Sequence, residues 1–138
     1  EAMYPLRIES QRIRADSGGP GEFRGGLGVE KIVTALSPCA VQVHCDRTAC
    51  PPWGILGGGD GAVPEVVIEP LNEPPRNVLK GRFPLGTGDR VRVLSGGGGG
   101  YAEPKNRDPS KVAHDIRLGY ITRDAALEIY GVCLDDQE

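Results

Sequence analysis

Apolar and polar residues alternate along several short runs in the first two thirds of the chain. Runs rich in β-branched residues, separated by glycine and proline, read LRIESQRIRA, VEKIVTAL, AVQVHC, EVVIEPL and DRVRVL. In the third run Val41 and Val43 alternate with Gln42 and His44, which is typical of a strand with one buried and one polar face. Proline is poorly accommodated in central strands, and the chain has 12 prolines. The pattern therefore predicts small antiparallel sheets joined by long irregular loops.

After residue 107 the apolar residues adopt a helical period. Asp108 is a suitable N-cap and Pro109 a suitable first helical residue, and an apolar face follows at Val112, Ala113 and Ile116. A second helix is predicted over 123–130, after Thr122 and before a capping Gly131. Two helices so close in the chain predict a helical hairpin.

A length of 138 residues fits one domain better than two. We therefore predict a single module over residues 1–138. Its fold class is mainly β (α+β), with small loop-rich antiparallel sheets in a β-rich part at 1–100 and a helical hairpin at 108–131.

Charge and hydropathy bear on the partners and the compartment. The net charge is −3 with acids and bases interleaved, so no basic stripe indicates a nucleic-acid partner. The apolar runs are far shorter than the roughly 20 residues that cross a bilayer, and EAMYPLRIES lacks the pattern of a signal peptide. Four unevenly spaced cysteines do not suggest a secreted disulfide scaffold. These features predict a cytoplasmic protein with no membrane partner.

Glycine is concentrated in three blocks, 17–28, 53–61 and 96–100, which hold six, five and five of the 21 glycines. Such clusters indicate close backbone approach or positive φ angles. For 96–100 one interpretation is a run of backbone N–H groups around an anion, and the favoured one is a flexible or tightly packed turn. No G-x-x-x-x-G-K-[ST] phosphate loop is present, so no cofactor-binding residue is predicted.

Polar and aromatic residues in the first two blocks, or just before the first, are candidates for binding. Arg14, Asp16 and Arg24 would either hold a ligand or partner loop, or form an internal ion pair, and the second interpretation is favoured. Trp53 is interpreted as an anchor at an interface. Ser17 has no evident histidine partner, so the sequence predicts no catalytic residue in this chain.

Cysteine and histidine lie close together in SPCAVQVHCDRTACPP. A loop that folds back on itself would allow a structural zinc site with ligands from Cys39, His44, Cys45 and Cys50, and Cys133 or His114 as a remote ligand. No C-x-x-C pair is present, and adjacent residues of a strand point to opposite faces. The favoured alternative is free cysteines packed as small apolar residues.

Three longer motifs resemble one protein family. RADSGGPGEFRGGLGVE, PPWGILGGGDG and GTGDRVRVLSGGGGGYAEPKNRDPSKVAHDIRLGYITRDAALEIYGV look like the C-terminal part of the hydantoinase B/oxoprolinase family, in the family's order. The family pattern joins R-x-D-S-G-G-x-G, P-W-G-x-x-G-G and G-G-G-G-Y followed by R-D-P and Y-G-V. A usual member is several times longer than this chain.

The resemblance implies a function within a larger assembly. Within this family the chain most resembles the small separate subunit of acetophenone carboxylases. These are ATP-dependent ligases that join bicarbonate to acetophenone and give benzoylacetate. This implies a noncatalytic subunit of a hetero-oligomer with larger hydantoinase A-like and hydantoinase B-like partners, with ATP bound on the partner subunits. The alternatives are a tail module of a hydantoinase or 5-oxoprolinase, which opens a cyclic amide, and an independent ligand-binding β-module.

Overall fold

The computed structural model describes residues 3–133 of the chain. Contacts within the described residues concentrate in two compact units. The first, which we call the sheet unit, contains residues 3–12, 29–48 and 64–95. The second, the glycine unit, contains residues 13–28, 49–63 and 96–133. No described helix is long and apolar enough to cross a membrane.

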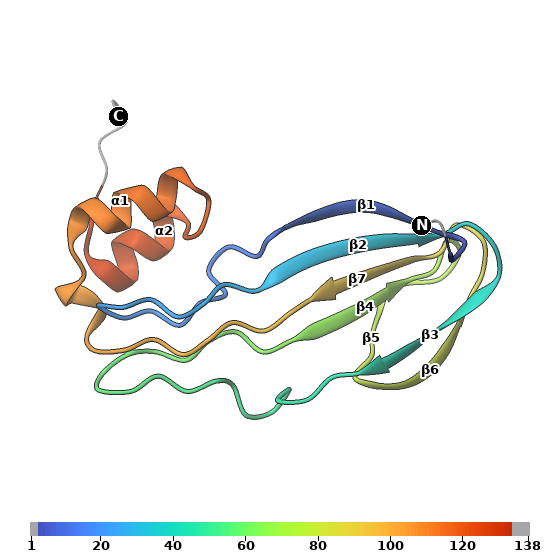
Figure 1. Ribbon diagram of the computed structural model, residues 1–138, viewed down its shortest axis with the longest axis horizontal. Helices are drawn as coiled ribbons and strands as arrows, with labels where there is room; N and C mark the ends of the chain where they lie inside the picture. The colour runs from blue at the N-terminus through green and yellow to red at the C-terminus, as the bar shows by residue number, and fades with distance from the viewer. Residues whose placement is uncertain (1–2, 134–138) are drawn as a thin grey trace. The chain divides into compact units, whose positions relative to one another are not determined.

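The sheet unit is built from two sheets (Figure 1). The larger has the strand order β1-β2-β7-β4-β5, formed by Leu6–Ile13, Val29–Ala35, Arg90–Leu94, Glu65–Glu69 and Arg76–Asn77. The central strand β7 pairs antiparallel with β2 and with β4. The smaller sheet is an antiparallel pair of β3 (Cys39–His44) and β6 (Lys80–Leu85). The predicted mainly β fold with small antiparallel sheets is confirmed.

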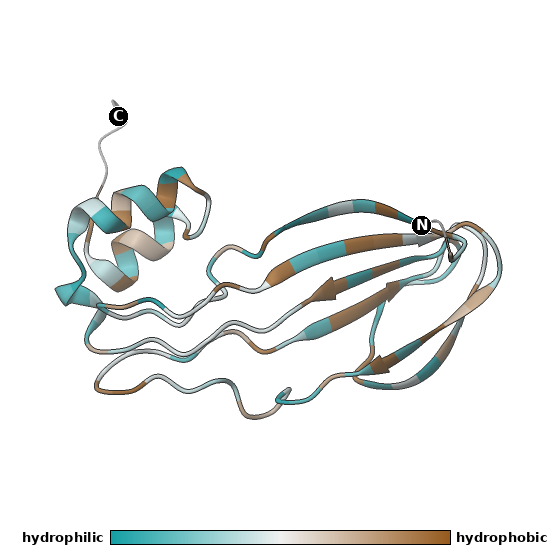
Figure 2. Cartoon of the chain, in the orientation of Figure 1, coloured by the Kyte–Doolittle hydropathy of each residue, from teal (hydrophilic) through white to brown (hydrophobic). Residues whose placement is uncertain are grey.

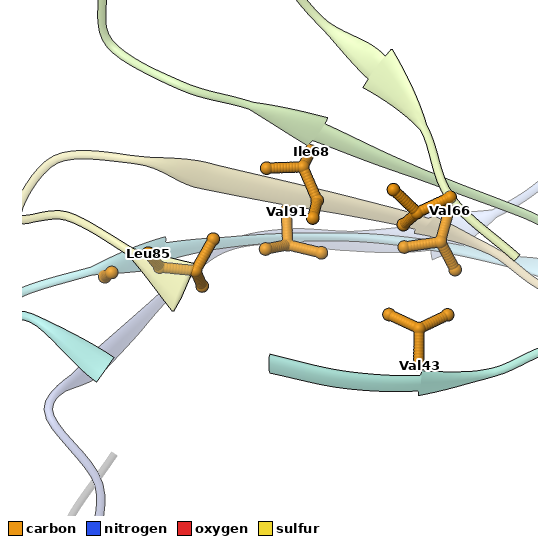
Figure 3. Packing of buried hydrophobic residues seen from close by; sticks show 7 residues of the cluster. Val43, Val66, Ile68, Leu85 and Val91 are labelled. Atoms are coloured by element: carbon orange, nitrogen blue, oxygen red, sulfur yellow. The ribbon is translucent and has the colours of Figure 1, made fainter. Parts of the chain in front are cut away.

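The core of the sheet unit follows from the alternation that the sequence shows. Val91 of β7 lies opposite Val33 of β2 and Ile68 of β4. Polar and apolar bands alternate along these strands in Figure 2. Figure 3 shows Val43 of β3 pointing toward Val66 of the larger sheet. The buried cluster consists of Ala35, Val43, Val66, Ile68, Val78, Leu85 and Val91.

The other face of the larger sheet carries paired charges. The buried carboxylate of Glu30 accepts hydrogen bonds from Arg12 of β1 and from the Nε of Arg92 of β7, the latter at 2.6 Å. These hydrogen bonds, that of Arg12 first, hold the pKa of Glu30 below its usual range, against the opposing effect of burial. Beside it the Thr34 hydroxyl donates to Glu9 at 2.7 Å.

Strand β6 is not predicted from the sequence, because it contains Gly81 and Pro84, which are typical of turns and loops. Gly81 has φ +137°, which few other residues adopt, and Pro84 lies opposite Ala40 of β3. Within the described residues β6 has β3 as its one neighbour, so it is an edge strand, where proline is tolerated.

The helical hairpin of the glycine unit is confirmed, with one difference. Helix α1 (Pro109–Arg117) begins where Asp108 accepts a hydrogen bond from the backbone N–H of Ser110 at 2.8 Å. The second helix begins as α2 (Arg123–Ala125), capped by Thr122, and continues as a π-helical turn, η2 (Ala126–Tyr130). This turn ends at Gly131, in the left-handed region, whose N–H is directed at the carbonyls of Ala126 and Leu127, while the N–H of Val132 donates to the carbonyl of Ala126 at 3.0 Å. A short 3-10 turn, η1 (Pro104–Asn106), precedes the hairpin.

The hairpin encloses a small core of its own. Val112, Ile121, Ala126 and Tyr130 are buried together there. Burial raises the pKa of the Tyr130 phenol above its ordinary value.

The three glycine blocks run beside one another as extended, mutually hydrogen-bonded segments, which we call the glycine bundle. Gly19 donates to the carbonyl of Gly98, and Gly98 donates to that of Gly26, both at 2.8 Å. The N–H of Gly100 donates to the carbonyl of Gly59, and the N–H of Gly59 donates to the carbonyl of Pro20. The bundle therefore satisfies its polar backbone groups by bonds between segments, as a sheet does.

Close packing explains why these positions are glycine. A Cβ atom on Gly97 would overlap the carbonyl oxygen of Ser17, and one on Gly99 would overlap that of Trp53. The anion-binding interpretation of 96–100 is wrong, because Gly97, Gly98 and Gly100 all donate their N–H groups to carbonyl oxygens of this chain.

Candidate functional site

Arg14 and Ser17 are bonded within the glycine unit. An Nη1 of Arg14 donates to the carbonyl oxygen of Val63 at 2.8 Å. The buried hydroxyl of Ser17 donates to the carbonyl of Arg14 and accepts from the backbone N–H of Gly28 at 2.8 Å. Both roles of this hydroxyl are thus taken by backbone groups, which makes Ser17 a structural link in the glycine bundle.

Asp16 connects the first glycine block to the start of the second helix. Its φ is +55°, in the left-handed region that aspartate tolerates better than most residues. Its carboxylate accepts a hydrogen bond from the backbone N–H of Thr122 at 2.9 Å, and its own backbone N–H donates to the carbonyl oxygen of Tyr120 at 3.0 Å. The ion pair predicted among Arg14, Asp16 and Arg24 is wrong for Arg24, which has a different carboxylate partner.

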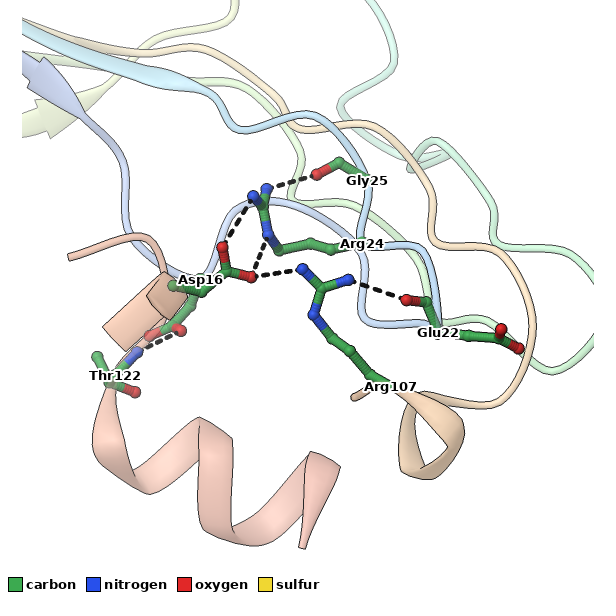
Figure 4. A network of polar contacts seen from close by, with 7 residues as sticks. Asp16, Glu22, Arg24, Gly25, Arg107 and Thr122 are labelled. Atoms are coloured by element: carbon green, nitrogen blue, oxygen red, sulfur yellow. Dashed lines mark hydrogen bonds and ion pairs between the residues drawn. The ribbon is translucent and has the colours of Figure 1, made fainter. Parts of the chain in front are cut away.

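That partner is Asp115, in a group of three residues that we call the Asp115 cluster: Arg24, Arg107 and Asp115. The Nε of Arg24 donates to Asp115 Oδ2 at 3.0 Å, and an Nη of Arg107 donates to the same oxygen at 2.9 Å. Figure 4 shows the two guanidinium groups converging on one carboxylate. Arg24 and Arg107 also donate to the carbonyl oxygens of Gly25 and Glu22, each at 2.9 Å.

The cluster is buried and carries one excess positive charge. The side chain of Asp115 is 5% exposed, those of Arg24 and Arg107 15% and 11%. Arg24 also stacks over the ring of Tyr120, with its Cζ 5.3 Å from the ring centroid, a favourable cation–π contact. The Nε of Arg107 is buried and has no hydrogen-bond partner within residues 3–133. The arrangement fixes the first glycine block to α1 rather than presenting a reactive group.

Sequence reasoning missed Asp115 and Arg107. One signal was present: Asp115 follows Val112 by three residues, so it lies on the face of α1 that the apolar pattern predicts to be buried. A carboxylate on such a face requires a cationic partner.

The predicted zinc site does not form. Cys39, Val41 and Val43 lie on the inner face of β3, and His44 is exposed on the outer face, where its ring nitrogen is 2.8 Å from the amide nitrogen of Gln42. Cys39 and His44 are also five positions apart on an extended strand, which places their backbones about 16 Å from each other. Over the described residues, no three His, Cys, Asp or Glu side chains are placed to hold one metal ion.

Cys39 and Cys45 instead pack against the buried cluster of the sheet unit, as the alternative interpretation has it. Cys50 is exposed.

The glycine unit also exposes an apolar surface. We call Phe23, Ile55, Leu56 and Tyr101 the apolar patch. The backbone of Tyr101 forms bridges with Phe23 and with Ile55, and the rings of Phe23 and Tyr101 meet edge to face with centroids 6.0 Å apart. All four side chains are exposed, and so is Trp53, at 65%.

The sheet unit contains an apolar cavity of about 210 Å³. Within the described part of the chain no charged side chain lines it; the lining residues there are Tyr4, Pro5, Leu6, Val33, Ala35, Cys39, Ala40, Val41, Leu85, Val91 and Val93. Its lining is thus apolar apart from the phenol of Tyr4 and the thiol of Cys39, and it includes no carboxylate, imidazole or amine among the described residues.

The described residues do not fit ATP. In the glycine run 96–100, the N–H groups of Gly97, Gly98 and Gly100 are bonded to carbonyl oxygens of this chain and are not open to a phosphate. The largely buried guanidinium groups of Arg24 and Arg107 already share the carboxylate of Asp115.

The chain is similar in sequence and fold to one part of several larger enzyme polypeptides. The chain is 33% identical over its whole length to the putative B-type subunit of a D-/L-hydantoinase from a Pseudomonas species, and covers 24% of that protein. It is 26% identical to the acetone carboxylase alpha subunit of Xanthobacter autotrophicus over 96% of this chain and 22% of that subunit. The crystal structure of the ATP-dependent caprolactamase from Pseudomonas jessenii superposes with a TM-score of 0.84 at 26% identity, over 99% of this chain and 25% of that chain.

The chain thus spans about a quarter of the length of each of these three relatives. Residues 1–104 match the family described as hydantoinase B/oxoprolinase. This match confirms the resemblance of the glycine motifs, and the chain belongs to the hydantoinase B/oxoprolinase family.

Proposed function

We propose that this chain acts as one noncatalytic structural module of an ATP-dependent enzyme of its family. It completes a larger hydantoinase B-like polypeptide, which works with a hydantoinase A-like subunit that binds ATP. The observation that carries the proposal is the internal bonding of the polar residues in the family's first glycine motif: Asp16, Ser17 and Arg24 each bond to other groups of this chain. They are therefore suited to holding the glycine bundle together rather than to reacting with a substrate.

The reaction that the similarities favour is the ATP-dependent opening of a cyclic amide. The matched hydantoinase polypeptide is more similar in sequence than the matched acetone carboxylase subunit, at 33% against 26% identity. The caprolactamase, itself an ATP-dependent enzyme, is similar in fold and sequence over nearly the whole chain.

The second candidate is ATP-dependent carboxylation of a ketone with bicarbonate, for which acetophenone is the substrate that the sequence motifs suggest. The match to an acetone carboxylase subunit over 96% of this chain supports it. In either case residues on the partner chains would determine the substrate, because the polar side chains of the glycine motifs within residues 3–133 are bonded to other groups of this chain.

The structural role is tested by transplantation. The matched quarter of the P. jessenii caprolactamase chain is removed and replaced by this chain, and caprolactam-dependent ATP hydrolysis is measured. We expect the truncated enzyme to be inactive and the chimera to recover at least a tenth of the normal rate. A chimera that assembles with its partner subunit yet stays inactive would contradict a purely structural role.

An experiment that identifies the reaction class requires the subunits with which this chain naturally assembles. The chain is purified from its native host with whatever hydantoinase A-like and B-like subunits accompany it, and the rate of ATP hydrolysis in the presence of cyclic amides is compared with the rate in the presence of acetophenone and bicarbonate. Stimulation by a cyclic amide, without fixation of labelled bicarbonate, supports the first candidate. Fixation of labelled bicarbonate into a β-keto acid supports the second.

A further inference from the structure

The turn that carries Leu56 combines exposure with an unfavourable backbone conformation. Gly58 donates to the carbonyl of Ile55 at 3.0 Å, and the two residues between them, Leu56 and Gly57, have φ angles of +54° and +92°. Glycine adopts such angles freely, whereas a leucine there places its Cβ against the following carbonyl. Leu56 is nevertheless 71% exposed, so burial within this chain does not offset the strain.

A second strained residue lies beside the same surface. Ala102 has φ +60°, and its N–H donates to the carbonyl of Ile55 at 2.9 Å. Its own carbonyl accepts from Glu22, so the strained backbone ties together the segments that carry Phe23, Ile55 and Tyr101. Backbone strain of this kind is concentrated at functional sites, where the surrounding structure holds it in place.

The composition of the apolar patch is that of a binding surface. Two aromatic rings and two branched aliphatic side chains are presented by three segments whose backbones are hydrogen-bonded to one another. Aromatic anchors held on a rigid backbone lose little conformational entropy on binding.

We propose that the apolar patch, with Leu56 at its tip, is the surface on which the larger hydantoinase B-like polypeptide docks through an apolar segment. This inference rests on the proposed function and names the surface that it uses. The occupant follows from the comparison with the caprolactamase, because the region that matches this chain over 99% of its length is joined there to three times as much further polypeptide. Leucine at a strained, solvated turn is explained when that side chain is buried in the complex.

Replacing Leu56 by asparagine tests both halves of the argument, because asparagine tolerates the left-handed region and lacks the apolar side chain. The probe is the P. jessenii caprolactamase chain without its matched quarter. We expect Leu56→Asn to raise the melting temperature of this chain by a few degrees and to weaken binding of the probe at least tenfold. The matched control is Leu71→Asn, since Leu71 is 70% exposed in a turn of the sheet unit; it should leave binding unchanged.

The outcomes separate this inference from the proposed function. If the wild-type chain does not bind the probe, the proposed function is wrong and the inference falls with it. If the wild-type chain binds and Leu56→Asn binds equally well, the apolar patch is not the docking surface. Self-association of the wild-type chain that Leu56→Asn abolishes would instead identify a second copy as the occupant and overturn the inference.

Discussion

Arg24 and Asp115 are 91 residues apart in the sequence, and their side chains form a buried ion pair in which Nε and Oδ2 are 3.0 Å apart. Because Arg107 shares the same carboxylate, removal of Asp115 would leave two buried guanidinium groups without a counter-charge. Breaking a buried ion pair on one side costs far more than removing a surface pair.

We therefore expect Asp115→Ala to lower the free energy of unfolding by about 3 kcal/mol or more. Urea unfolding followed by circular dichroism measures this change. The control is Glu128→Ala at an exposed position of the second helix, expected to alter stability by about 0.5 kcal/mol at most. Equal midpoints for Asp115→Ala and the wild type would show that the cluster does not stabilise the fold.

Acidification should weaken the sheet unit through Glu30. Its pKa is lowered in the folded state, first by the hydrogen bond from Arg12 and also by Arg92. The stabilisation is thus present above the unfolded value of about 4.3 and is lost as pH falls through that value toward the folded pKa. Glu9, whose pKa is lowered by the hydrogen bond from Thr34 and by Arg7, acts in the same direction.

We expect Glu30→Gln to be less stable than the wild type at pH 7 and to lose less stability between pH 6 and pH 3. Thermal unfolding at a series of pH values tests this, with the exposed Glu73→Gln as the control. Parallel pH profiles for Glu30→Gln and the wild type would contradict the assignment.

Alanine substitutions at two glycines test whether close packing, rather than chain flexibility, requires glycine in the glycine bundle. In Gly97→Ala the new Cβ overlaps the carbonyl oxygen of Ser17, whereas in Gly26→Ala it meets no atom within 4 Å. We expect Gly97→Ala to lose about 2 kcal/mol or more, or to fail to fold. Gly26→Ala should be neutral or stabilised by about 0.5 kcal/mol, through a less flexible unfolded chain. Urea midpoints decide, and equal effects of the two substitutions would refute the packing argument.

The histidines test the noncatalytic role. His44 is exposed beside Gln42, and His114 is exposed on α1. We expect His44→Ala and His114→Ala to leave the steady-state rate of the assembled enzyme within about twofold of the wild type. Loss of a general base lowers rates about 10²–10⁴-fold. A decrease of that size in a variant that still assembles would assign a catalytic role to this chain.

Much of the local structure was predictable from sequence because it depends on interactions over a few residues. The cap of α1 at Asp108 needs one side chain and the N–H two residues later, and β3 needs the alternation of Val41 and Val43 with polar neighbours. Strand β6 could not be predicted in this way, because Pro84 is acceptable only at the edge position that pairing with β3 creates.

For the candidate site too, features of local sequence were predictable and contacts between distant segments were not. Sequence alone identified the glycine blocks, Trp53 and Arg24 as unusual, since composition and spacing are visible without a fold. The tertiary structure decided what they do: it paired Arg24 with Asp115, packed Gly97 against the backbone of Ser17, and separated His44 from the inward-facing Cys39. The physical reason is distance along the chain. Caps and periodic faces arise from neighbours within about four residues, whereas ion pairs, backbone contacts and metal sites depend on which distant segments folding brings together.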